Sequence, residues 1–118
     1  MELNEMKVGD FLKMAEMFKA RKTKQDPKEE NGGIRIVVLQ RGWVAIGRFF
    51  QKGHKCRLEN AATIRIWGTS GKAGLSYLAD EGPTKDTVLD KTKNAVRFHE
   101  LTVVHMYDCN EAVWSKLL

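Results

Sequence analysis

Residues 61–82, AATIRIWGTSGKAGLSYLADEG, contain the side chains whose types and spacing best suit the binding of an anion. The first part of this segment is predicted to be a strand, in which side chains alternate between two faces. The row predicted to face the core is Ala62, Ile64 and Ile66. The opposite row places the cation of Arg65 two residues from the indole of Trp67. A guanidinium binds phosphate and an indole stacks on a base, so this row suits a nucleotide.

A glycine-rich loop follows this strand and leads into a predicted helical turn. The glycines are Gly68, Gly71 and Gly74. Glycine permits backbone conformations in which successive N–H groups converge on an anion. A helix over residues 75–79 would bring its N-terminus, with Ser76, to the same place. A seat for a phosphate-bearing ligand is therefore predicted, and an ordinary turn is the alternative. The loop is not a Walker A motif, because Ala73 follows Lys72 where serine or threonine is required.

The net charge of +5 is concentrated in one part of the chain. Residues 1–33 are neutral and residues 68–118 carry −1, whereas residues 34–67 hold seven basic residues and one acid, which gives +6. Aromatic side chains are interleaved with these cations, at Trp43, Phe49, Phe50 and Trp67. Cations with aromatic rings suit phosphates and stacked bases. A solubilising basic surface is the alternative interpretation.

Several classes of protein are excluded or disfavoured by what the sequence lacks. At 118 residues the chain is expected to form one domain with at most an appendage. Its first residues lack the apolar core of a signal peptide, and it has no apolar run of about 18 residues, so neither a signal peptide nor a membrane span is predicted. Cys56 and Cys109 stand alone, which argues against a zinc site and favours free thiols in a reducing cytoplasm. We find no nucleophile elbow, paired carboxylates or metal-ligand cluster, and therefore expect a binding protein without catalytic residues, metal or cofactor.

The chain is predicted to divide into three parts. Residues 1–20 form an oligomerisation helix, residues 21–33 a polar linker, and residues 34–118 a ligand-binding β domain. The helix carries an apolar stripe with helical spacing, at Phe11, Met14, Ala15 and Phe18. Such a short helix must pack on something. It could fold back on its own domain, but the length of the linker favours a neighbouring subunit.

The third part predicts an α+β fold, mainly antiparallel β, with a small curled sheet or barrel. Strands are expected over residues 34–40, 43–51, 55–59, 61–67, 95–98 and 101–107, with bends at Gly42 and Gly47 and a tight turn at residues 52–54. Residues 83–94 are expected to be a polar loop, either a flap or a mobile connection. A short C-terminal helix over residues 111–117 is predicted, with Asn110 as its cap and Ala112, Val113 and Leu117 toward the core.

Four segments together resemble a family of small bacteriophage proteins over residues 34–115. They are a strand ending in V-x-x-G, a Leu-x-Asn-Ala…Trp strand, a Leu-Ser-x-Leu-Ala turn and a Cys-x-Glu-Ala helix start, at Val44–Gly47, Leu58–Trp67, Leu75–Ala79 and Cys109–Ala112. Within this group the chain is similar to the anti-Thoeris proteins that phages use as sponges. The resemblance implies a homo-oligomer in the host cytoplasm, expected to be a hexamer. It would bind cyclic ADP-ribose isomers or cyclic oligonucleotides without cleaving them.

The predicted site combines cations, aromatic rings and backbone donors. Arg65 and Arg97 would neutralise phosphates, and Trp67 and Trp43 would stack on a base. The full set of predicted ligand-binding residues is Arg41, Trp43, Arg65, Trp67, Gly68, Ser70, Gly71, Lys72, Ser76, Arg97 and His99. Whether Lys55 and Arg57 belong to it stays open. Two alternatives remain: a nucleic-acid-binding phage accessory protein that uses the +6 segment, and a structural or partner-binding phage protein that uses its N-terminal helix.

Overall fold

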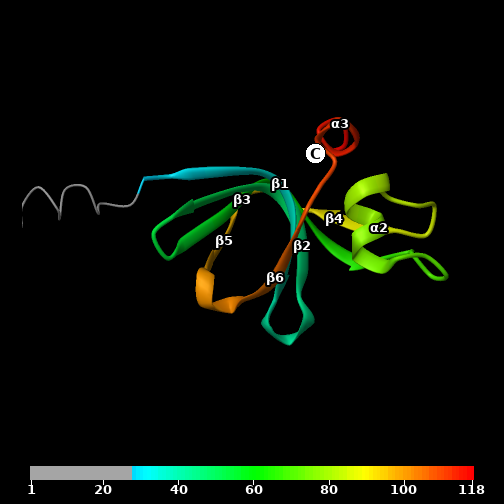
Figure 1. Cartoon of the computed structure of the whole chain (residues 1–118), viewed down its shortest axis with the longest axis horizontal. Coiled ribbons are helices and arrows are strands. Elements are labelled where there is room, and N and C mark those ends of the chain that lie inside the picture. Colours follow the sequence, from blue (N-terminus) through cyan, green and yellow to red (C-terminus); the bar gives the residue numbers. More distant parts are fainter. Residues whose placement is uncertain (1–27) are drawn as a thin grey trace, which may run out of the picture.

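The computed structural model of the chain describes residues 28–118 (Figure 1). The helix predicted for residues 1–20 and residues 21–27 of the predicted linker lie outside these residues. The strands are β1 (Glu30–Leu39), β2 (Val44–Lys52), β3 (Lys55–Ile66), β4 (Val88–Lys91), β5 (Val96–His99) and β6 (Val103–Asp108). The helices are α2 (Gly74–Glu81) and α3 (Glu111–Trp114), with 3-10 turns η2 (Gln40–Gly42) and η3 (Glu100–Thr102). The first strand begins four residues before the predicted Ile34.

The strands form one antiparallel sheet in the order β4-β3-β2-β1-β6. The fifth strand pairs with the first part of β3, and β4 pairs with its last part. The short η3 turn connects β5, beside β3, to β6, beside β1, and this connection requires the sheet to curl (Figure 1). The predicted mainly antiparallel β fold with short helices is confirmed for the described residues.

A bulge in the pairing of β2 with β3 allows the central strands to bend. The register of β2 against β3 shifts between Ile46 and Arg48, at the glycine where a bend was predicted. A Cβ on Gly47 would lie 3.0 Å from the Glu59 carbonyl oxygen, so only glycine lets β3 approach this closely. Opposite it, Asn60 has a positive φ of 49°. The shift moves the buried row of β3 to the other face, and Ala62 and Ile64 therefore pack with a different core cluster from Leu58.

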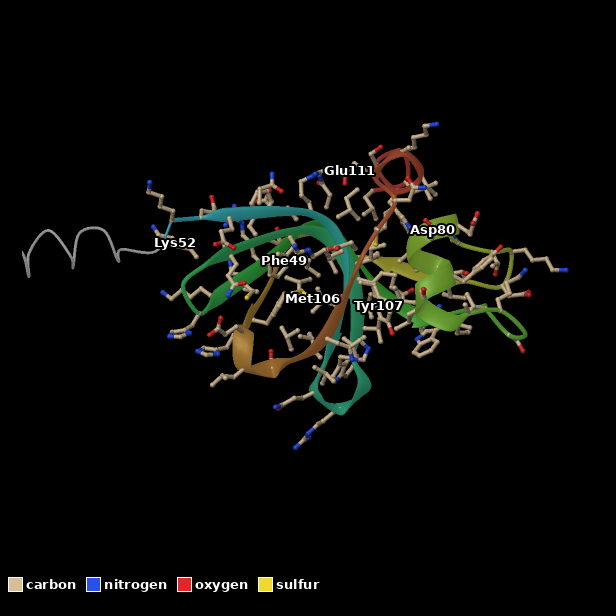
Figure 2. The ribbon with its side chains drawn as sticks, viewed as in Figure 1. Phe49, Lys52, Asp80, Met106, Tyr107 and Glu111 are labelled. Atoms are coloured by element: carbon tan, nitrogen blue, oxygen red, sulfur yellow. The ribbon has the colours of Figure 1, made fainter. Side chains whose placement is uncertain are left out.

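Each face of the sheet buries its own apolar cluster. On one face, Ile36 and Ile46 pack with Leu78 of α2 and Trp114 of α3. On the other face, Phe49 and Leu58 pack with Met106 inside the curl that β5 and β6 complete, and Figure 2 shows Phe49 and Met106 on this enclosed side. Phe49 also contacts the ring of Phe98, with the ring centroids 6.4 Å apart.

Three local predictions were wrong. Ile66 was predicted to face the core, but it is 50% exposed, because a register shift between Ile64 and Ile66 breaks the alternation. The predicted loop over residues 83–94 contains β4, which forms an edge strand on β3. The C-terminal helix is shorter than predicted. Its buried anchor is Trp114, with an exposed fraction of 0%, whereas Ala112 and Leu117, which were predicted to face the core, are exposed.

Candidate functional site

The structure separates the predicted site residues into two groups at opposite ends of the sheet. Ala45 pairs with Thr63, so Trp43 and Arg65, two residues beyond each, lie at one end. Arg97 pairs with Arg57 near the beginning of β3. The eight residues from Arg57 to Arg65 span about 26 Å of strand. Arg97 and His99 therefore do not join the group that includes Arg65.

The η2 turn and the residue after it carry Arg41 and Trp43 of the first group. Arg41 adopts a positive φ of 68°, and Gly42 follows with 80°, so the chain reverses within three residues. The Leu39 N–H donates to the Trp43 carbonyl oxygen at 2.7 Å and closes this turn. The side chain of Arg41 is exposed and Trp43 is 65% exposed. The β1–β2 hairpin thus carries a large apolar ring into solvent beside a cation.

The end of β3 and the residue after it carry Arg65 and Trp67 of the same group. The Nε of Arg65 lies 3.0 Å from Oδ2 of Asp90 on β4, and both side chains are more than half exposed. An exposed ion pair of this kind exchanges easily, and a guanidinium has further N–H donors for a phosphate. Trp67 is 44% exposed and its ring lies beside Gly74 at the start of α2. Ile66, between Arg65 and Trp67 in the chain, is also exposed, although it was predicted to face the core.

The glycine loop is held in place by a turn from the chain before β4. The Thr84 hydroxyl donates to the Gly68 carbonyl oxygen at 2.6 Å, and the Thr87 hydroxyl donates to the Trp67 carbonyl oxygen at 2.7 Å. The Lys72 N–H donates to the Thr69 carbonyl oxygen at 3.0 Å. These two threonines position Trp67, a role that was not predicted from the sequence.

A hollow of about 350 Å³ lies between this loop and the turn that holds it. Gly68, Ser70 and Lys72 line it, together with residues 81–86. Its charged side chains are Lys72, Lys85, Glu81 and Asp86, so positive and negative charges balance. The ammonium group of Lys72 lies 4.7 Å from the centroid of the Tyr77 ring.

The predicted residues Gly71 and Ser76 lie near this hollow but do not line it. Gly71 is exposed at the loop tip, with no atom within 4 Å of an added Cβ. Ser76 lines a neighbouring hollow with Asp80 and Asp108. Because these hollows are neutral or acidic, the excess positive charge at this end comes from exposed cations outside them, such as Arg41.

At the other end of the sheet, His99 belongs to a compact polar cluster. Its ring stacks on that of His54, with centroids 5.4 Å apart and planes inclined by 13°. Its Nδ1 accepts a hydrogen bond from the Leu101 N–H at 3.1 Å. His54 Nδ1 lies 2.5 Å from Oε1 of Glu100, and this hydrogen bond is the main cause that lowers the pKa of the Glu100 carboxyl. These contacts join η3 to the β2–β3 turn.

Both cysteines are poor nucleophiles. Burial raises the pKa of the Cys56 thiol, and burial raises that of Cys109 to about 12.

Residues 28–118 contain neither a group of three or more His, Cys, Asp and Glu side chains placed to hold a metal ion nor a helix long and apolar enough to cross a membrane. No protein-family model, curated protein or solved structure that was compared with the chain matches it.

Proposed function

We propose that the protein binds an anionic nucleotide at the end of the sheet formed by Trp43, Arg65 and Trp67. The observation that carries this proposal is the exposure of two indoles, 65% for Trp43 and 44% for Trp67, at the same end as an exposed guanidinium. Exposed apolar side chains that gather in one region of a surface favour an interaction site there. Indoles stack on bases, and a guanidinium forms paired hydrogen bonds with phosphate, so a nucleotide satisfies both.

The resemblance to anti-Thoeris sponges supports a more specific proposal. The protein would hold a cyclic nucleotide signal, either a cyclic ADP-ribose isomer or a cyclic oligonucleotide, and release it unaltered. It would act in the host cytoplasm during phage infection, without a cofactor. Residues 28–118 of a single chain offer an open surface here, whereas tight retention requires a ligand to be largely enclosed. The proposal therefore includes a homo-oligomer, expected to be a hexamer, in which a neighbouring subunit covers the ligand.

The first test is a thermal-shift panel of cyclic ADP-ribose isomers and cyclic di- and trinucleotides on the full chain. One compound should raise the unfolding temperature by several degrees and be recovered intact after heating the complex. Recovery of an altered compound would show an enzyme, and the absence of any shift would contradict nucleotide binding.

The variants Trp43→Ala and Arg65→Ala test the site itself. Each should weaken binding of that compound by roughly 10- to 100-fold, since base stacking contributes about 1–3 kcal/mol and a charged hydrogen bond about 1.5–3 kcal/mol. Lys93→Ala removes an exposed cation from the β4–β5 connection and is the matched control. Calorimetric titration measures the three affinities. Unchanged affinity in both folded site variants would place the ligand elsewhere.

A further inference from the structure

A cationic face lies at the end of the sheet remote from Trp43 and Arg65. Three adjacent strands contribute to this face, with Lys52 from β2, Lys55 and Arg57 from β3, and Arg97 from β5. Lys52 pairs directly with Lys55, and Arg57 pairs directly with Arg97. Like charges directly opposite one another destabilise a sheet. Two such pairs side by side concentrate positive charge, and bound anions would reduce the repulsion between them.

Three of the four cations of this face are not paired with a carboxylate of the described residues. Among residues 28–118, Lys52, Lys55 and Arg97 form no ion pair, and all three are exposed. The two helices lie toward the other end of the sheet, and Figure 2 shows Lys52 far along the ribbon from Asp80 and Glu111. Neither α2 nor α3 therefore covers the face.

Arg57 differs from these cations because carboxylates already hold it. Its guanidinium lies over the Phe50 ring, 4.3 Å from the centroid, which fixes its plane against the sheet. Its Nε lies 3.0 Å from Oε1 of Glu59 on the same strand. Its Nη1 is hydrogen-bonded to Glu29, which lies ahead of β1. Glu59 of the sheet thus binds one edge of the guanidinium, and Glu29 outside the sheet binds another.

The carboxylate of Glu29 occupies a position with the electrostatics of an anion site. The hydrogen bond from Arg57 is the main cause that lowers its pKa, and the charges of Lys52 and Arg97 lower it further. The side chain is 44% exposed and Glu29 is outside the sheet. An exposed carboxylate on a guanidinium is held weakly and can be replaced by another anion.

We propose that this face binds the phosphodiester backbone of a nucleic-acid strand, and that Glu29 occupies the phosphate position on Arg57 until a strand displaces it. The planar fork of a guanidinium accepts carboxylate and phosphate in the same geometry. A strand brings several phosphates at once and can pair with Lys52, Lys55 and Arg97 together, whereas Glu29 supplies one charge. The face shares no residue with the proposed nucleotide site, so the failure of either proposal leaves the other standing.

Fluorescence anisotropy with a fluorescein-labelled 20-nucleotide single-stranded DNA tests this proposal on the full chain at about 50 and 200 mM salt. Glu29→Gln should bind roughly 3- to 10-fold more tightly than the wild type, because the competing charge is gone. Arg97→Ala should bind several-fold more weakly and lower the salt slope by about one phosphate contact. Lys85→Ala, which removes an exposed cation beside the glycine loop at the other end of the sheet, should stay within about twofold of the wild type.

Three outcomes would overturn the proposal. If Glu29→Gln lowers the unfolding temperature and leaves DNA affinity unchanged, Glu29 only holds the chain before β1 against the sheet. If a 5-nucleotide strand or inorganic pyrophosphate binds as tightly as the 20-nucleotide strand, the cationic face binds a free phosphate group and not an extended strand. If a cyclic nucleotide that binds at Trp43 displaces the DNA at saturation, the two ligands share one site.

Discussion

Gly68 and Gly71 both adopt left-handed backbone conformations, with φ of 69° and 77°, but their surroundings differ. A Cβ on Gly68 would lie 2.3 Å from the Thr87 nitrogen and 2.5 Å from the Asp86 carbonyl carbon. A Cβ on Gly71 would meet no atom within 4 Å. Gly68 is therefore required for the close approach of the turn that positions Trp67, whereas Gly71 is required only for its own backbone angle.

Alanine substitutions separate these two requirements. Gly68→Ala should lower the free energy of unfolding by about 2–4 kcal/mol, the sum of left-handed strain and overpacking. Gly71→Ala should lower it by about 1 kcal/mol, because only the strain applies. Urea unfolding of both variants measures the difference. Equal losses would mean that the Asp86–Thr87 backbone moves aside at little cost, and that the close approach does not constrain the loop.

At the scale of elements, α3 is too short to be stable without packing. Asn110 caps it by accepting the Ala112 N–H at 3.2 Å, as predicted. Trp114 holds it against α2, with its indole N–H donating to the Leu78 and Ala79 carbonyl oxygens at 3.0 and 3.1 Å. Both carbonyls also accept a backbone N–H, from Gly82 and Asn110 respectively. Loss of the indole donor would therefore leave neither carbonyl unpaired.

Substitutions at Trp114 should consequently act through volume more than through hydrogen bonding. Trp114→Ala should cost about 3–5 kcal/mol of unfolding free energy, as expected for a fully buried aromatic side chain. Trp114→Phe should cost only about 1–2 kcal/mol, the sum of a small cavity and a hydrogen bond whose acceptors keep other partners. Leu117→Ala, at an exposed position, is the control and should change stability by less than about 0.5 kcal/mol. A loss in Trp114→Phe as large as that in Trp114→Ala would contradict this division.

The elements also show which features could be predicted from the sequence. Strands rich in β-branched residues, the bend at Gly47 and the Asn110 cap follow local patterns, and all three are present. The edge strand β4 was missed because its residues, Val88–Lys91, are half polar and it is held only by pairing with β3. The separation of Arg97 from Arg65 was also missed, because it depends on which part of β3 each later strand pairs with. Register between distant strands leaves no local signal in the chain.

At the scale of the whole molecule, three carboxylates join segments that are distant in sequence. Glu29 links the chain before β1 to Arg57, Glu100 links η3 to His54, and Glu111 links α3 to Arg48 at 2.6 Å. Glu111 also accepts the Ile34 N–H at 3.3 Å. In each case the hydrogen bond to the basic partner is the main cause that lowers the pKa of the carboxyl group. These contacts connect both ends of the described chain to the sheet.

The lowered pKa values predict how stability depends on pH. The folded protein keeps these carboxylates ionised to a lower pH than the unfolded chain does, so the unfolded chain binds more protons as the pH falls. The stabilisation is complete above the ordinary pKa of glutamate and is lost as the pH falls through the lowered values. The urea midpoint should therefore decrease between about pH 5 and pH 3.

The variant with Glu29→Gln, Glu100→Gln and Glu111→Gln should show a shallower decrease over this range. Glu81→Gln, at a position that forms no ion pair within residues 28–118, should keep the wild-type slope. An unchanged slope in the triple variant would place the acid sensitivity in other carboxylates, and the three contacts would then hold their segments without contributing to stability.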